Sequence, residues 1–92
     1  MPSYPGGHAE MKRFIKDNLK YPRHSGTVQG KVFIEFIVNE DGSLSDFRLV
    51  KGLVESFDNS ALETVKKMPN WIPAKRENTP IRTKMVIPIR FD

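Results

Sequence analysis

A long apolar strand followed by a tight turn stands out in VQGKVFIEFIVNEDGS, residues 28–43. Because strand side chains alternate between the two faces of a sheet, one face carries Val28, Gly30, Val32, Ile34, Phe36 and Val38. The other face carries Phe33 and Ile37 between charged or polar residues, so it is only partly polar. Apolar side chains on both faces are typical of the centre of a sheet. We therefore predict a central strand over residues 28–39.

The turn after this strand predicts a β-hairpin. The run NEDGS at residues 39–43 contains Asp-Gly, a pair that tolerates the positive φ angles of tight hairpin turns. A second strand is expected over residues 44–50. Leu44 and Val50 are out of phase with its other apolar residues, which indicates a bulge or a strand with two apolar faces.

Two amphipathic helices are predicted on either side of the hairpin in the sequence. The first spans residues 8–19 and has apolar residues at helical spacing, namely Met11, Phe14, Ile15 and Leu19. Residues 1–7, which are rich in proline and glycine, are expected to be a loosely ordered lead. The second helix starts with Ser56 as its predicted N-cap and ends before Pro69. Its apolar stripe consists of Phe57, Ala61, Leu62, Val65 and Met68.

The last strand is predicted over residues 81–91, after a polar turn over residues 75–80. Pro88 has no N–H to donate to a strand ladder, so it favours a position at a sheet edge. This strand returns through a helix, and to lie antiparallel to the first strand it must sit on that strand's other side. The expected fold is an α+β two-layer sandwich with topology αββαβ. Its three-stranded antiparallel sheet has the order second, first, third, and both helices pack on one face.

Length and composition restrict the class of protein. The chain has 92 residues, which predicts one domain over residues 1–92. Apolar residues make up 38% and charged residues 28%, as in globular proteins, and the absence of cysteine excludes disulfide scaffolds and thiolate chemistry. The net charge of +4 allows acidic partners. No stretch approaches the roughly 18 apolar residues of a membrane span, and no signal peptide is visible, so we expect any anchor to lie outside this sequence.

No group of residues predicts catalysis or metal binding. His8 and His24 lie in a loop or at a helix start without a partner at metal-ligand spacing, and we interpret both as solvated. Glu40 and Asp41 belong to the hairpin turn, where they have a geometric reason to occur. Gly6 and Gly7 lack the strand and the Gly-Lys-Ser/Thr of a phosphate loop. We expect no catalytic residues, no metal and no cofactor, and therefore not an enzyme.

Two kinds of binding remain. A basic strand face with Arg82, Lys84 and Arg90 could contact phosphates, but no aromatic residues are interleaved with it for base stacking, which disfavours nucleic acid. An edge strand exposes a row of unpaired backbone groups, which a protein either protects with charges or uses to bind an extended peptide by β-augmentation. The same basic residues suit protection against aggregation and an acidic extended peptide, and both interpretations stay open.

Several short motifs, in order along nearly the whole chain, match a known family. They are Tyr4-Pro5-Gly6-Gly7, Lys20-Tyr21-Pro22, Gly30-Lys31-Val32, Phe36-Ile37-Val38, Asp41-Gly42-Ser43, Phe57-Asp58 with Ala61, MPNWIPAK at residues 68–75, and Pro88-Ile89-Arg90-Phe91. Through them the chain resembles the C-terminal domain of TonB-type energy transducers, especially the form common in Bacteroidetes-like proteins. Each motif is weak alone, and the tyrosine–proline, hairpin and tryptophan-x-proline elements are fairly specific together.

This resemblance implies a location, a partner and a task. The domain would lie in the periplasm, and its parent would be anchored in the inner membrane by an N-terminal helix and a proline-rich spacer. It would bind the TonB box, a short extended segment of an outer-membrane transporter. It would then relay work from a proton-driven inner-membrane motor, so that siderophores, cobalamin, glycans or similar nutrients enter.

The resemblance also implies site residues. In the family the box adds as a strand beside the last strand, which is the edge that Pro88 selects. The partner-binding residues expected there are Ile81, Arg82, Thr83, Lys84, Met85, Val86 and Ile87. Flanking contacts are expected from Tyr21, Pro22 and Arg23, with His24 nearby, and Trp71 and Pro73 resemble the family's packing anchor. Because Pro88 removes one donor, we expect the pairing to be broken there or confined to residues 81–87.

Two further alternatives stay open. The same fold serves as a sensor or interaction module fused to a membrane peptidase or a signalling receptor, and the sequence upstream would distinguish that case. An open edge strand also permits a homodimer by strand exchange between two copies.

Overall fold

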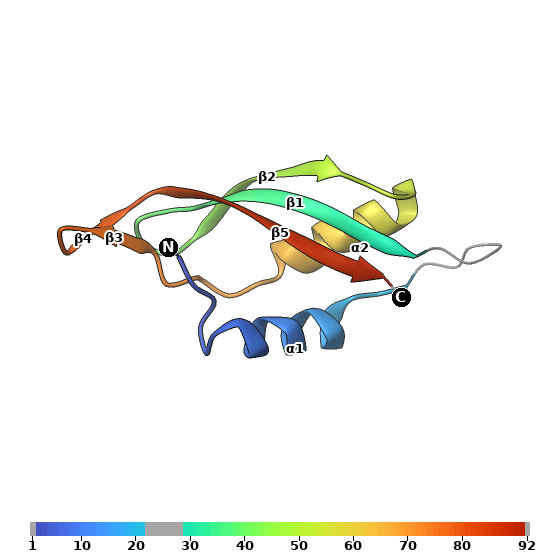
Figure 1. Cartoon of the computed structure of the whole chain (residues 1–92), viewed down its shortest axis with the longest axis horizontal. Helices are drawn as coiled ribbons and strands as arrows, with labels where there is room; N and C mark the ends of the chain where they lie inside the picture. The colour runs from blue at the N-terminus through green and yellow to red at the C-terminus, as the bar shows by residue number, and fades with distance from the viewer. Residues whose placement is uncertain (1, 22–28, 92) are drawn as a thin grey trace.

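A computed structural model describes residues 2–21 and 29–91 and shows helices, a main sheet and a small hairpin (Figure 1). In chain order the elements are α1 (His8–Asn18), β1 (Gly30–Val38), β2 (Leu44–Lys51), α2 (Glu55–Lys66), β3 (Ala74–Arg76), β4 (Thr79–Ile81) and β5 (Thr83–Phe91). The main sheet has the order β2-β1-β5, and β1 is antiparallel to both neighbours. The predicted αββαβ order and the position of the last strand at a sheet edge are confirmed.

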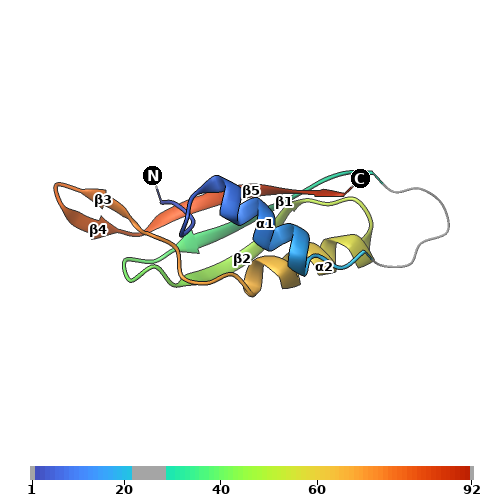
Figure 2. The same cartoon turned by 90° about the horizontal axis from the view of Figure 1, so that it is seen from below.

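The molecule has two layers, with both helices on the same face of the main sheet (Figure 2). The helix-facing side of β1 forms the centre of the core, because Val32, Ile34, Phe36 and Val38 are fully buried. Fully burying a side chain of this size contributes about 1.5–3 kcal/mol. Phe33 and Ile37 are half-buried on the opposite face, so the prediction of a central strand with two apolar faces is confirmed.

The hairpin turn is tied to the segment after α2. Gly42 has φ 89°, and a Cβ at this position would lie 2.2 Å from the Trp71 carbonyl oxygen. The Trp71 N–H donates a 2.8 Å hydrogen bond to the Gly42 carbonyl oxygen. Next to it, the Ser43 hydroxyl and N–H donate to Asp41 Oδ1 at 2.6 and 2.9 Å and lower the pKa of the Asp41 carboxyl. The predicted turn is confirmed, and glycine is required at residue 42 for both its φ and its close approach.

The edge strand β2 is irregular. Its pairing with β1 shifts register twice, between Phe33 and Ile34 and between Glu35 and Ile37, and Asp46 has φ 53°. Each shift adds one residue on β2, which is the geometry of a β-bulge. The bulge expected from the apolar pattern of this strand is confirmed.

The start of α2 differs from the prediction. The helix begins at Glu55 with Val54 as its N-cap residue, and no side chain caps it. Ser56 therefore lies within the first turn, and the prediction that it is the N-cap was wrong. Instead, the N–H of Leu53, before the helix, donates a 2.8 Å hydrogen bond to Asp58 Oδ1. A carboxylate in the first turn holds the preceding loop against the helix and also suits the positive end of the helix dipole.

The described part of the predicted loose lead is held in place. Ser3 and Ile72 exchange two backbone hydrogen bonds of 2.9 and 2.8 Å. Tyr4 is buried edge-on against Trp71, with the ring centroids 5.9 Å apart. This burial, together with the Glu10 carboxylate, raises the pKa of the Tyr4 hydroxyl. Composition could not reveal this bridge, because the two residues that form it lie almost seventy residues apart in the sequence.

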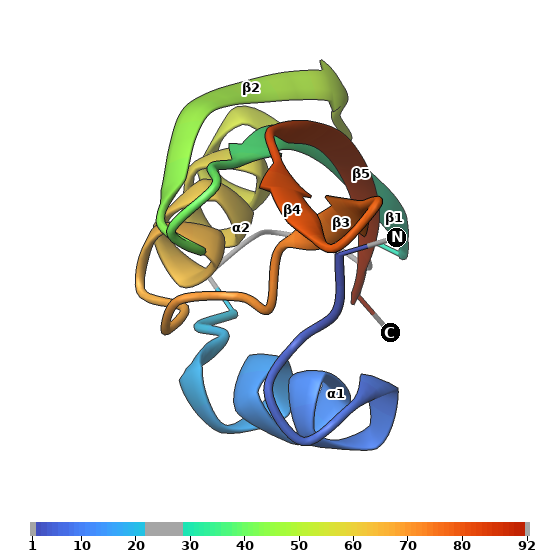
Figure 3. The same cartoon turned by 90° about the vertical axis from the view of Figure 1, so that its left-hand side faces the viewer.

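The last predicted strand is two elements, not one. Residues 74–81 form the β3–β4 hairpin, in which Ala74 pairs with Ile81, and β5 begins at Thr83. The hairpin turn places Glu77 and Asn78 at φ 51° and 66°. Two consecutive positive φ angles are typical of a type I′ turn, which usually carries Asn-Gly or Asp-Gly. The hairpin projects from one end of the main sheet (Figure 1), and it lies in front when the molecule is viewed from that end (Figure 3). It was missed as a polar turn because Glu-Asn is an unusual pair for a type I′ turn.

Candidate functional site

β5 is a regular edge strand. It pairs with β1 through nine consecutive residue pairs, from Thr83 opposite Val38 to Phe91 opposite Gly30, without a register shift. On its other side, no strand pairs with β5 within residues 2–21 and 29–91. The opposite edge, β2, is interrupted by its bulges. Because bulges twist an edge away from pairing, β5 is the better edge of this sheet for an added strand.

The direction of the backbone groups of β5 follows from the hairpin. The Asn39 N–H donates a 2.8 Å hydrogen bond to the Ser43 carbonyl oxygen across the turn, so the odd-numbered residues of β1 direct their backbone groups toward β2. Antiparallel strands alternate between hydrogen-bonded and non-bonded pairs, and the even-numbered residues of β1 therefore face β5. In the observed register their partners are odd-numbered, for example Met85 and Ile87. The N–H and C=O groups of Lys84 and Val86 consequently point outward.

Pro88 fits this alternation. It is even-numbered, so its missing N–H belongs to the outward row and no ladder bond with β1 is lost. Its carbonyl oxygen still points outward as an acceptor. Pro88 therefore leaves the ladder with β1 intact and removes one outward donor beyond Val86, as the sequence predicted for this strand.

A groove lies between β5 and α1, and neither β2 nor α2 contributes to its walls. It consists of two hollows, of about 570 and 330 Å³, that share His8, Met11 and Pro88. The larger hollow is further lined by Lys12, Ile15, Lys16, Leu19, Tyr21, Lys31 and Arg90. The smaller one is further lined by Pro2, Ser3, Tyr4, Trp71, Met85, Val86 and Ile87. We call this space the α1–β5 groove.

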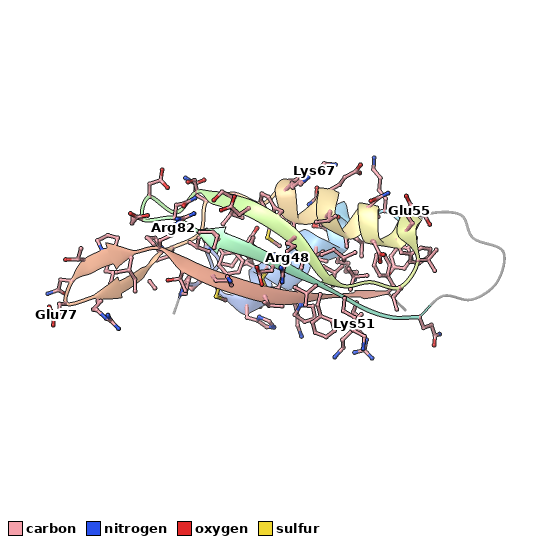
Figure 4. The ribbon with its side chains drawn as sticks, turned by 90° about the horizontal axis from the view of Figure 1, so that it is seen from above. Arg48, Lys51, Glu55, Lys67, Glu77 and Arg82 are labelled. Carbon is pink, nitrogen blue, oxygen red and sulfur yellow. The ribbon has the colours of Figure 1, made fainter. Side chains whose placement is uncertain are left out.

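Charge is distributed unevenly around β5. Among the described residues, no carboxylate lines the α1–β5 groove, and its larger hollow carries four lysine or arginine side chains. On the helix-free face of the sheet, Glu35 lies between Arg48 at 3.7 Å and Lys84 at 3.9 Å, and Arg82 contacts Asp46 at 3.2 Å. Arg48 and Arg82 are labelled in Figure 4. The acidic residues of that face are thus paired with basic ones, and the surroundings of β5 favour an acidic partner.

The structure places five of the seven predicted strand residues on β5. Ile81 belongs to β4 and Arg82 lies between the two strands, so neither belongs to the open edge strand. Thr83, Met85 and Ile87 direct their backbone groups toward β1, which leaves Lys84 and Val86 as the outward members of the set.

The predicted flanking and anchoring residues are partly placed. Tyr21 is 55% exposed, and its ring meets that of Phe91 edge-on at 5.4 Å, which brings it to the end of β5. Trp71 is buried in the core against Phe36, and Pro73, two residues further along, is half-buried. Pro22, Arg23 and His24 lie outside the described residues.

Sequence reasoning missed the contribution of α1 to this site. Lys12 and Lys16 do not belong to the apolar stripe of the predicted helix, and in the structure they line the groove beside β5. The only signal was their spacing of four residues, which places two cations on one helix face. Which element that face meets depends on tertiary packing.

Other classes of site find no support in the part of the chain that is described. His8 is exposed, and residues 2–21 and 29–91 contain no group of three or more histidine, aspartate or glutamate side chains that could hold a metal ion. Within the same ranges, no helix is long and apolar enough to cross a membrane.

Comparison with known proteins identifies the family. The model of the Gram-negative bacterial TonB protein C-terminal family matches residues 17–92. Protein TonB from two Helicobacter pylori strains, 26695 and J99, is 25% identical to the chain over 81 residues, which is 85% of the chain. The chain spans only 28% and 29% of the length of these two relatives.

Solved structures agree with the sequence relatives. A solution structure of the Helicobacter pylori TonB C-terminal domain is 26% identical, has a TM-score of 0.67, and the match covers 91% of this chain and 90% of that one. A longer form of the same domain has a TM-score of 0.58 at 21% identity and shows the fold alone. These relatives come from Helicobacter, so the narrower Bacteroidetes-like resemblance is not what the comparisons support. The chain belongs to the family of Gram-negative bacterial TonB protein C-terminal domains.

Proposed function

We propose that this domain binds an extended segment of an outer-membrane transporter, its TonB box, by β-augmentation on the outer flank of β5. The observation that carries the proposal is the uninterrupted pairing of β5 with β1, which leaves a regular outward row of backbone groups at Lys84 and Val86. Such a row is the template that β-strand addition requires. The basic surroundings of the row favour a segment that contains acidic residues.

The same geometry suits the transmission of force. A strand paired with β5 and pulled along its own axis loads its backbone hydrogen bonds together. Each bond has a net worth of about 0.5–1.5 kcal/mol, so several loaded at once resist pulling better than one side-chain contact. A modest affinity is therefore compatible with a complex that resists dissociation under force.

The cellular setting follows from the family and is part of the proposal. The domain would lie in the periplasm, in a parent protein anchored in the inner membrane and coupled there to a proton-driven motor. We treat residues 1–92 as one domain that delivers this work to the transporter for nutrient uptake. The chain covers less than a third of the length of its TonB relatives, and the anchor and the motor contacts would belong to the remainder.

A proline substitution in the outward row tests the proposal. Val86→Pro removes an outward donor without removing a ladder bond with β1, and Pro88 shows that the row tolerates proline. Affinity for a synthetic TonB-box peptide, measured by titration calorimetry, should fall about twofold to tenfold, which corresponds to one lost hydrogen bond.

Val86→Ala is the matched control, because it shortens the same side chain, 47% exposed, and keeps the donor. It should bind more tightly than Val86→Pro, since it keeps the backbone donor and loses only part of a side chain that lines the smaller hollow. Unchanged affinity in a folded Val86→Pro variant would contradict pairing at β5.

A further inference from the structure

The N-terminal helix lies mostly outside the residues that match the family model. The match begins at residue 17, so Tyr4 and most of α1 precede it. Even so, α1 is one wall of the groove along β5, with Met11, Ile15 and Leu19 facing the hollow. The question is therefore what this helix adds to a site whose other wall is the open edge.

The helix is fixed to the core at both ends, which makes it a stable wall. At its N-terminal end the Ser3–Ile72 bridge anchors the lead, and Tyr4 packs between Phe14 and Trp71 at centroid distances of 6.1 and 5.9 Å. Just beyond its C-terminal end, the Ser60 hydroxyl of α2 donates a hydrogen bond to the Lys20 carbonyl oxygen. An element held at two points loses little further conformational freedom when a ligand binds.

The two hollows differ in chemistry. Among the described residues, the hollow near Met85 and Val86 is lined mainly by apolar and aromatic side chains, together with Ser3 and His8. The hollow near Pro88 carries Lys12, Lys16, Lys31 and Arg90 above an apolar floor. Among residues 2–21 and 29–91, Lys12, Lys16 and Lys31 have no carboxylate within 4.0 Å. The groove thus has an apolar end and a cationic end.

We propose that α1 is the second wall of the peptide site and selects an extended peptide with an acidic side chain at the cationic end of the α1–β5 groove and an apolar side chain at the other end. This inference rests on the proposed function, because a strand paired with the outer flank of β5 occupies the space beside α1. Val86 and Arg90 are four residues apart, about 13 Å along a strand. The acidic and apolar side chains should accordingly lie about four residues apart in the peptide.

The test uses two synthetic peptides of nine residues, the length of β5. One carries a glutamate and a leucine four residues apart with threonine and valine elsewhere, and the other replaces the glutamate with glutamine. Their affinities are measured by titration calorimetry at low salt, where exposed charges are least screened. Wild-type protein should bind the glutamate peptide more tightly, by about twofold to fivefold for each ion pair formed.

Charge reversal on α1 is the decisive variant. Lys12→Glu/Lys16→Glu should weaken the glutamate peptide about twofold to thirtyfold and the glutamine peptide by less than about twofold. Lys67→Glu/Lys75→Glu lowers the net charge by the same amount at exposed sites that do not line the groove, and should keep the preference for glutamate. The neutral pair Lys12→Gln/Lys16→Gln, which is milder for the helix, should give an intermediate loss.

The outcomes separate this inference from the proposed function. If Val86→Pro weakens both peptides and the α1 variants bind like the wild type, β-augmentation stands and the role of α1 is refuted. An equal loss in both charge-reversed pairs would also refute it, because only the net charge would then matter. If the α1 variants lose the glutamate peptide while Val86→Pro keeps it, the groove binds peptide and pairing at β5 is refuted.

Discussion

Replacing Gly42 with alanine tests whether the hairpin turn and the segment after α2 hold each other in place. The substitution forces a residue with a Cβ into φ 89°, which costs about 1–2 kcal/mol. The new Cβ would also lie 2.2 Å from the Trp71 carbonyl oxygen, so the two segments must separate and the hydrogen bond from the Trp71 N–H is lost. That bond is worth about 0.5–1.5 kcal/mol, and the total is about 1.5–3.5 kcal/mol before Trp71 repacks.

Gly7→Ala is the matched control. Gly7 has a similar φ of 90°, but a Cβ there meets nothing within 4 Å, so the variant carries the backbone cost alone. Thermal unfolding followed by Trp71 fluorescence should show Gly42→Ala melting about 6–28 °C below the wild type, since 1 kcal/mol shifts the midpoint of a domain this size by about 4–8 °C. If Gly42→Ala is no less stable than Gly7→Ala, the contact between the turn and Trp71 does not stabilise the fold.

Three further outcomes are expected. Because hydrogen bonds from Ser43 lower the folded-state pKa of Asp41, their contribution is present above the unfolded value of 3.8 and is lost as pH falls through the folded value. The melting temperature of the wild type should therefore drop as the pH falls below about 4, and this drop should be smaller in Ser43→Ala. An equal drop in both proteins would count against these bonds. Glu77→Gly, at φ 51°, should stabilise the β3–β4 hairpin by up to about 1 kcal/mol, seen as slower amide exchange in β3; faster exchange would show that no strain is stored there. If copies associate through β5, sedimentation at high concentration should show a dimer that Val86→Pro weakens, and a dimer unaffected by Val86→Pro must use another surface.

The main sheet was predictable because its pattern is local. Alternation in β1, the Asp-Gly pair of the turn and Pro88 in β5 each act within a few residues, and together they determine the strand order. The expectation that the chain is not an enzyme also agrees with the family it belongs to.

The remaining features depend on contacts that local sequence patterns do not contain. The lead is ordered by Ser3 and Ile72, and the start of α2 is set by Asp58 reaching back to Leu53, neither of which a helix or turn pattern contains. The β3–β4 hairpin has a Glu-Asn turn and a proline in one strand, both of which disfavour a hairpin prediction. The approach of Lys12 to β5 was unpredictable for the same reason, because helical periodicity shows which residues share a face but not what the face meets.

The central claim is that the outer flank of β5 is open in the free domain and is occupied by a partner strand in the complex. Amide hydrogen exchange of β5, residue by residue, with and without a TonB-box peptide, tests it most directly. Met85 and Ile87, whose N–H groups face β1, should exchange slowly in both states, whereas Lys84 and Val86 should exchange fast alone and slowly with peptide. Slow exchange of Lys84 and Val86 in the free monomer, or fast exchange that persists at saturating peptide, would contradict the claim.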